Sequence, residues 1–281
     1  MAHRILCDDY CSLEKSLKND MPFSVSAYYI VTQLIKGSLT NRSVWVDSWP
    51  TYSVVVVSDN QHKNAGLQRV CCFCRDIKNT LALDTVLQHV AKLLSNTLLL
   101  FGLRFGVLDQ LLSYRSAAYR VSNDAVVMHM PKENIRQISI PEGFMVTTLK
   151  QEHVETVVQE WPYSGTFSDC KEWICDMIKQ FPSVCIENEH GKPIAWVLQQ
   201  DYGYIGMLHV VPEYRRAKLG SAVTMLLMEK LHKEGNYICS SISVENKTSI
   251  AFHERTKFNY VDDFKIGFVV YPSEESSQNQ I

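Results

Sequence analysis

The chain has 281 residues, of which 46% are hydrophobic, so it is long enough for two domains of ordinary size or for one large one. Its formal net charge of −2 argues against a general nucleic-acid binder, because domains that depend on phosphate contacts carry a marked basic excess. The longest apolar run, Leu98 to Leu103, is too short to span a bilayer, so we expect no membrane span.

The first half of the sequence, residues 1–131, predicts a mixed α/β domain. It begins with an amphipathic helix, whose apolar residues are Leu6, Tyr10, Leu13 and Leu17. Strand character follows in residues 27–35, 44–47, 52–58, 69–73 and 124–130, and helical spacing in residues 81–94. This half of the sequence has no Gly-rich loop and no cluster of acids or histidines.

Nine cysteines are scattered along the chain, and only Cys71, Cys72 and Cys74 cluster. Cys71 and Cys74 form a single C-x-x-C motif without a second pair, inside a predicted buried strand. A metal or redox role is one interpretation. Core thiols in a reducing compartment are the interpretation that we favour, so no metal is predicted.

A charged connector after Pro131 marks a candidate boundary, and residues 132–272 predict a second α/β domain. Its predicted strands are residues 144–149, 184–187, 194–200, 205–211, 237–244 and 265–270. Its predicted helices are residues 152–161, 169–181, 218–234 and 247–257. The polar tail, residues 273–281, is predicted to be disordered.

The most informative stretch joins the strand that Pro212 ends to the long helix that Gly235 stops. Arg215, Arg216 and Lys218 lie at the start of that helix. Cations are unfavourable in a first helical turn, whereas its unpaired backbone N–H groups attract anions. The stretch therefore predicts an anion site, with a solvated basic turn as the alternative.

Residues 212–222 resemble the acyl-CoA-binding motif of the GCN5-related N-acetyltransferase superfamily, Arg/Gln-x-x-Gly-x-Gly/Ala. Arg215 and Gly220 match, and Lys218 stands where the first Gly is expected. The stretches 46–50 (VDSWP), 181–185 (FPSVC) and 190–196 (HGKPIAW) narrow the resemblance to the glycine N-acyltransferase family. It covers most of the chain and implies that superfamily's fold, with a mixed central sheet flanked by helices and a degenerate, related N-terminal half.

The resemblance implies an acyl-CoA-dependent N-acyltransferase that acts on glycine or another small amino acid. Acyl-CoA is then the co-substrate, with its pantetheine arm along the central strand and its pyrophosphate on the basic turn. The implied cofactor-binding residues are Val210, Val211, Arg215, Arg216, Lys218, Leu219, Gly220, Ser221 and Asn246.

Catalytic residues are less clearly marked. His253 stands where the superfamily has a Tyr that protonates the departing thiolate, and a solvent-facing helix residue is the alternative. Tyr204 stands where glycine-conjugating members carry a Glu base, and a tyrosine is a poor base with its ordinary pKa near 10. His209 or Asp201 would replace that base if its side chain faced the groove, and His209 is alternatively a strand histidine bonded to the backbone.

Two other functions remain open on the sequence. One is an N-acetyltransferase for a protein or polyamine amine, and the other is a non-catalytic acyl-CoA-binding protein. The resemblance implies a mitochondrial location, although the acidic N-terminus lacks a clear presequence, which leaves a cytoplasmic location as the alternative.

Overall fold

The computed structural model describes residues 2–60, 67–121, 124–140, 142–166 and 168–272. The predicted disordered tail therefore lies outside the described residues. The chain divides into two compact units. One comprises Met1–Val127, Ser243–Asn246 and Val261–Ile281, and the other comprises Met128–Ile242 and Lys247–Tyr260.

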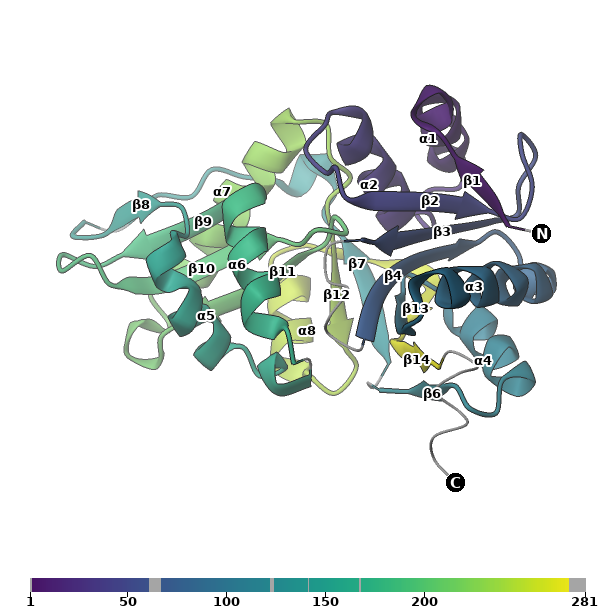
Figure 1. Cartoon of the computed structure of the whole chain (residues 1–281). Helices are drawn as coiled ribbons and strands as arrows, with labels where there is room; N and C mark the ends of the chain where they lie inside the picture. The colour runs from purple at the N-terminus through teal and green to yellow at the C-terminus, as the bar shows by residue number, and fades with distance from the viewer. Residues whose placement is uncertain (1, 61–66, 122–123, 141, 167, 273–281) are drawn as a thin grey trace. The chain divides into compact units, whose positions relative to one another are not determined.

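The first unit contains a seven-stranded sheet in the order β1-β2-β3-β4-β5-β14-β6 (Figure 1). Its strands are β1 (His3–Ile5), β2 (Arg42–Val46), β3 (Val54–Asp59), β4 (Leu67–Cys74), β5 (Thr97–Phe101), β6 (Tyr119–Arg120) and β14 (Val269–Tyr271). Its helices are α1 (Tyr10–Lys18), α2 (Val25–Ile35), α3 (Thr80–Leu94) and α4 (Phe105–Tyr114). Adjacent strands pair antiparallel except β4 and β5, which run parallel and are joined through α3.

Both faces of this sheet are apolar, as a sheet covered by helices on both sides requires. Val54 and Val56 face a buried cluster with Leu83 and Leu87 of α3. The intervening residues of β3 are also buried, and α2 packs against β3 and β4. The C-x-x-C cysteines lie in β4 as predicted, and both are buried.

The predicted strand over residues 27–35 is wrong, because this segment forms helix α2 (Val25–Ile35). A short run rich in apolar, β-branched and aromatic residues fits a buried strand and a buried helix equally well. Burial of Ala27, Ile30 and Val31 follows helical spacing. Strands β1, β5 and β6 and helix α4 were not predicted from the sequence.

The VDSWP stretch forms the turn between β2 and β3. A carboxylate oxygen of Asp47 accepts hydrogen bonds from the backbone N–H groups of Ser53, at 2.8 Å, and Val54, at 3.0 Å. Trp49 stacks on Tyr52 with ring centroids 6.2 Å apart. This stretch therefore holds a turn of the first unit together.

The second unit contains a four-stranded antiparallel sheet in the order β11-β10-β9-β8. Its strands are β8 (Met145–Thr147), β9 (Ser183–Glu187), β10 (Pro193–Gln199) and β11 (Ile205–Val210). Its helices are α5 (Val154–Glu160), α6 (Cys170–Gln180), α7 (Leu219–Lys233) and α8 (Lys247–Arg255). Helix α7 packs against β9, β10 and β11, and α6 packs against β10 and α5 (Figure 1).

The remaining strands are β7 (Ala125–His129), β12 (Cys239–Ser243) and β13 (Asn259–Ile266), which form a sheet in the order β12-β7-β13. The predicted order of two helices, a meander and a strand-helix-strand unit is therefore confirmed, and most of its last strand, β13, belongs to the first unit. The predicted strand over residues 265–270 instead covers the end of β13 and the start of β14.

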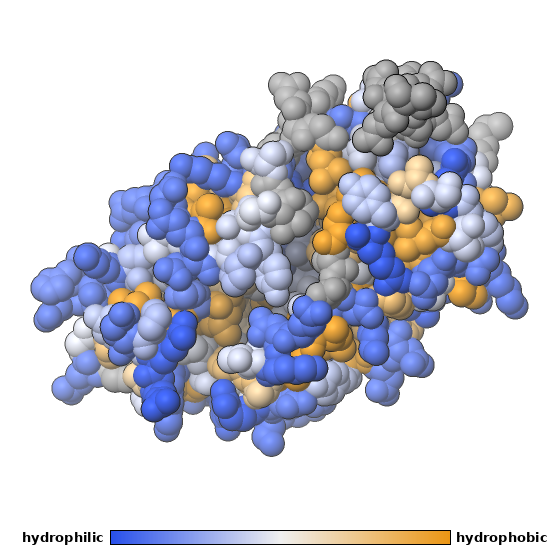
Figure 2. Space-filling view, turned by 90° about the horizontal axis from the view of Figure 1, so that it is seen from below, coloured by the Kyte–Doolittle hydropathy of each residue, from blue (hydrophilic) through white to orange (hydrophobic). Residues whose placement is uncertain are grey.

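No helix among the described residues is long and apolar enough to cross a membrane. Figure 2 shows hydrophilic residues around smaller hydrophobic groups on one face of the molecule.

Candidate functional site

The candidate site begins at strand β11, which forms one edge of the four-stranded sheet. The Ser240 hydroxyl on β12 donates a hydrogen bond to the Ile205 carbonyl at the start of β11, at 3.1 Å. Among the residues that the structure describes, the two strands do not pair beyond that point and belong to different sheets. An open strand edge of this kind offers backbone groups to an extended ligand.

A β-bulge lies in the middle of β11. Met207 has a φ of 55°, and the register with β10 shifts between the pairs Leu198–Gly206 and Trp196–His209. A bulge bends its strand and redirects the side chains that follow it. His209 and Val210 are the next paired residues after the bulge.

The basic turn follows β11 directly and leads into α7. Lys218 is the residue before the helix, and no side chain caps the helix start. Arg216 has a φ of 67° and Lys218 a φ of 61°, a left-handed conformation in which glycine is favoured. This geometry explains why the superfamily pattern has a Gly at the position of Lys218.

All three cationic side chains of the turn are exposed. Arg215 Nε donates a hydrogen bond to the Val210 carbonyl at 3.0 Å, which fixes the guanidinium beside the end of β11. The Val211 N–H donates to the Ile194 carbonyl at 2.9 Å, so this group is already engaged with β10. Uncapped N–H groups and adjacent cations make the start of α7 suitable for a phosphate.

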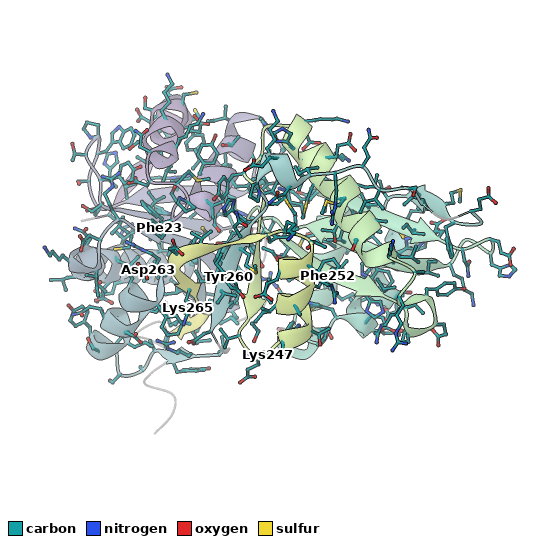
Figure 3. All side chains as sticks on the ribbon, turned by 180° about the vertical axis from the view of Figure 1, so that it is seen from behind. Phe23, Lys247, Phe252, Tyr260, Asp263 and Lys265 are labelled. Carbon is teal, nitrogen blue, oxygen red and sulfur yellow. The ribbon has the colours of Figure 1, made fainter. Side chains whose placement is uncertain are left out.

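Gly220 lies in the first turn of α7, where three elements meet. A Cβ atom added at Gly220 would lie 3.3 Å from Cγ2 of Val210 and 3.5 Å from Cε2 of Phe252. Phe252 lies on α8 and is labelled in Figure 3. Leu219 beside it is buried, and Ser221 is partly exposed. The fold therefore brings together the end of β11, the start of α7 and the middle of α8.

His209 stacks on Trp196 of β10, with ring centroids 4.7 Å apart and planes at 18°. Its Nε2 is enclosed and lies 3.5 Å from a carboxylate oxygen of Glu160, the last residue of α5. Burial lowers the pKa of His209 below its ordinary value, Glu160 opposes that shift, and the charge of Arg215 adds to it. A neutral imidazole at neutral pH is suited to act as a base.

Glu160 was not among the residues predicted from the sequence. A sequence signal for it existed, because an acidic side chain at a helix C-terminus is unfavourable against the helix dipole. The pairing of Glu160 with His209 depends on tertiary structure and could not be read from the spacing of the two residues.

The side chains of Tyr204 and Asp201, the other candidates for the base, are buried. Tyr204 is 1% exposed and contacts Tyr202 edge-on, with ring centroids 5.5 Å apart. Asp201 is buried and accepts a hydrogen bond from Trp173 Nε1 at 3.2 Å. Both side chains are packed inside the unit, so their geometry does not favour proton exchange with a substrate.

His253 is 5% exposed and contacts the rings of Phe252 and Phe258. Its Nδ1 lies 2.8 Å from the Ser249 carbonyl, so Nδ1 carries a proton that is engaged with the backbone. Burial lowers the pKa of His253, and the bond to Ser249 partly opposes this shift. The geometry favours a structural histidine, and its role as a proton donor stays a prediction.

Asn246 is exposed and directly precedes α8. Its backbone N–H donates to the Ser243 carbonyl at 2.9 Å. It belongs to the short segment Ser243–Asn246 of the first unit. Its predicted contact with CoA stays a prediction.

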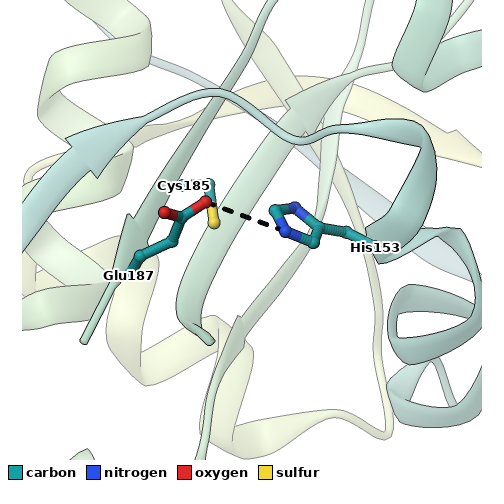
Figure 4. Close-up of side chains that lie close together, drawn as sticks. All are labelled: His153, Cys185 and Glu187. Carbon is teal, nitrogen blue, oxygen red and sulfur yellow. Dashed lines mark ion pairs between the residues drawn. The ribbon is translucent and has the colours of Figure 1, made fainter. Parts of the chain in front are cut away.

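One group of possible metal ligands occurs within the described part of the chain: His153, Cys185 and Glu187, with ligand atoms within 4.8 Å of one another (Figure 4). The Lys150 ammonium lies 2.7 Å from Glu187 Oε1, and the Lys150 N–H donates to His153 Nδ1 at 3.2 Å. Burial raises the pKa of Cys185 to about 12, so the thiol stays protonated. An ion pair and a helix cap account for this cluster, and catalysis without a metal stays a prediction.

Two family models match separate parts of the chain. Residues 8–83 match the aralkyl acyl-CoA:amino acid N-acyltransferase model, and residues 184–265 match the FR47-like protein model. The second match contains β11, the basic turn and α7. A bovine glycine N-acyltransferase is 24% identical over 265 residues, which cover 84% of this chain and 87% of the relative.

Solved structures show the same fold at low identity. A Drosophila protein matches with a TM-score of 0.76 and 16% identity, covering 96% of this chain and 98% of that one. A GCN5-related N-acetyltransferase from Sphaerobacter thermophilus matches with a TM-score of 0.60 and 14% identity, covering 97% and 96%. The fold class predicted from the sequence is therefore confirmed.

Proposed function

We infer that this chain, a member of the glycine N-acyltransferase-like family of the GCN5-related N-acetyltransferase superfamily, transfers an acyl group from acyl-CoA to the amine of glycine or another small amino acid. One observation carries this inference: the open edge of β11 leads into an uncapped, cationic start of α7. An extended arm that ends in a pyrophosphate matches both features.

In the proposed complex the pyrophosphate lies on the turn 215–221 and the pantetheine arm runs beside β11. Because the Val210 carbonyl already accepts from Arg215, we expect the arm to use backbone groups nearer the bulge. The guanidinium of Arg215 and the ammonium of Lys218 then attract the phosphates electrostatically.

The proposed reaction conserves atoms and needs no redox partner. His209 removes a proton from the acceptor ammonium, and the amine nitrogen attacks the thioester carbonyl. A C–N bond forms and the C–S bond breaks, with its electron pair leaving on sulfur. As the adduct collapses the nitrogen loses its second proton, the thiolate takes up one proton, and the proton held by His209 leaves to solvent, which gives an amide and free CoA.

A thiol-release assay tests this function. The full chain is mixed with acyl-CoAs of increasing chain length, each with glycine, other amino acids, a polyamine and a lysine peptide. We expect thiol release that depends on an amino acid and produces the matching amide. Turnover only with the polyamine or the peptide would favour the N-acetyltransferase alternative.

A non-catalytic acyl-CoA-binding protein is the second candidate, which the tyrosine at position 204 favours because a strand carboxylate is missing there. Calorimetric titration with CoA separates this candidate from the first. Tight CoA binding without turnover for any acyl-CoA and amine pair would support it. Absence of both binding and turnover would contradict both candidates.

We propose a mitochondrial location, and the family resemblance is its support. A fusion of the full chain to a fluorescent protein, imaged with a mitochondrial marker, tests it. Diffuse cytoplasmic fluorescence would favour the alternative.

A further inference from the structure

His209 lies beside a carboxylate that belongs to another element of the fold. The side chain of Glu160 is 46% exposed, while the side chain of His209 is only 14% exposed. Trp196 stacks on one face of the ring, so packing fixes the plane of the ring and leaves its tautomer and charge to its polar neighbours. Among the described residues, Nε2 of His209 has no hydrogen-bond partner, and Glu160 lies 3.5 Å away from it.

This geometry assigns different tasks to the two ring nitrogens. When the neutral ring carries its proton on Nε2, the nitrogen 3.5 Å from the carboxylate, Nδ1 keeps the lone pair that takes a proton. Once Nδ1 has taken a proton, the imidazolium lies next to an anion at 3.5 Å. An opposite charge at this distance favours the protonated ring and therefore promotes proton transfer to it.

We propose that Glu160 is a positioning residue that orients His209 and stabilises its protonated form during acyl transfer. Glu160 thus supplies from α5 the carboxylate that is missing at position 204 of the strand. The inference rests on the proposed function and deepens it.

The charged groups that act on His209 are few among the described residues. Glu160 on α5 favours the protonated ring, and Arg215 in the basic turn opposes it. The neighbour on β10 is Trp196, which does not titrate. Because Arg215 is also expected to bind phosphate, a bound CoA would partly neutralise its effect and leave Glu160 as the dominant charge.

The position of Glu160 is not explained by helix stability. Glu155, on the same helix, forms an ion pair with Lys171 at 2.5 Å, whereas Glu160 is at the C-terminal end, where the helix dipole disfavours an anion. A residue that lowers the stability of its own helix in this way is typical of a functional site. Glu155 is therefore a matched control, since it is an exposed glutamate on α5 with an ordinary partner.

The first measurement needs no turnover. The imidazole Cε1–H of His209, assigned by its loss in His209→Gln, is titrated by NMR in the wild type, Glu160→Gln and Glu155→Gln. We expect Glu160→Gln to shift the His209 titration to lower pH and Glu155→Gln to leave it in place. A His209 titration that Glu160→Gln does not move would overturn the proposal.

The second measurement uses steady-state acyl transfer. Glu160→Gln is expected to lower kcat roughly ten-fold, leave KM for acyl-CoA unchanged, and move the acid limb of kcat/KM to lower pH. In a His209→Gln background the same substitution should have no further effect. An equal loss in both backgrounds would show that Glu160 does not act through His209.

Failure of this inference is distinct from failure of the proposed function. If the wild type transfers no acyl group to any amine, the proposed function fails and the NMR titration alone decides whether the two side chains are coupled. If acyl transfer is present but the titration does not shift, the function stands and the positioning role of Glu160 is wrong.

Discussion

Lys218 combines two properties that substitution can separate: a positive charge and a left-handed backbone. Its φ and ψ are 61° and 9°, and its side chain is exposed. For a residue with a Cβ atom this conformation costs roughly 1–2 kcal/mol, while glycine loses about 0.5–1 kcal/mol of chain entropy on folding. We therefore expect Lys218→Gly to be more stable than Lys218→Ala by roughly 0.5–1 kcal/mol.

CoA affinity should follow the charge and the close approach of the backbone. Loss of one exposed cation is expected to cost about 0.2–1 kcal/mol of binding energy in both variants, and more at low salt. Lys218→Gly should recover part of this loss, because its backbone lets a phosphate approach more closely. Lys218→Arg should keep wild-type affinity.

Calorimetry with CoA at two salt concentrations and urea unfolding of each variant measure these effects. Lys230→Ala serves as the control, because Lys230 is an exposed lysine near the other end of α7. If glycine and alanine at position 218 confer equal stability, the left-handed backbone at this position does not strain the turn. If both variants bind CoA like the wild type at low salt, the pyrophosphate does not lie on this turn.

Three further predictions test other parts of the structure. Gly220→Ala should weaken CoA binding in calorimetry but change the unfolding free energy by less than about 1 kcal/mol, because the higher helix propensity of alanine offsets its close contact with Val210. Gly220→Val should also destabilise the second unit, since the larger side chain meets both Val210 and Phe252. The pKa of His253 is lowered in the folded protein, so the unfolded state binds more protons below about pH 6.5. Urea unfolding should therefore show that stability falls as the pH decreases from 6.5, and that it falls less in a folded His253→Gln variant. Slower thiol release by that variant would instead support a role of His253 in protonating the thiolate. Asp47→Ala should lower the unfolding free energy by about 1–3 kcal/mol, since two backbone N–H groups lose their acceptor, and leave CoA affinity unchanged.

Local signals identified the elements that build the proposed CoA site. Pro212 and Gly235 delimit the strand, the turn and α7, and apolar residues at helical spacing in α7 are buried: Leu219, Ala222, Val223, Leu227 and Leu231. The cations before α7 indicated an anion site because a positive charge at the start of a helix is unfavourable against the helix dipole. These features depend on residues close together in the sequence, so they could be predicted without a structure.

The remaining features depend on tertiary structure. Helix α2 was mistaken for a strand because its sequence is apolar at almost every position, and only packing against β3 and β4 decides its conformation. The burial of Tyr204 and His253, and the approach of Glu160 to His209, arise where separate helices and strands meet. Spacing along the chain carries no information on such contacts.

The stretches that identify the family stabilise the fold, whereas the residues proposed for binding and catalysis do not. In VDSWP, Asp47 binds the backbone of the β2–β3 turn, and in FPSVC the Ser183 hydroxyl accepts from the Leu149 N–H at 3.0 Å. Such contacts preserve a fold whatever reaction the protein performs. By contrast, Lys218 in a left-handed turn and Glu160 at the C-terminus of α5 each have a local cost. Lys218 directly precedes α7, and Glu160 lies 3.5 Å from His209 near the end of β11. Because a base need only reach the substrate amine, a carboxylate can act from α5 through His209 as well as from the strand itself, so a tyrosine at position 204 is compatible with acyl transfer.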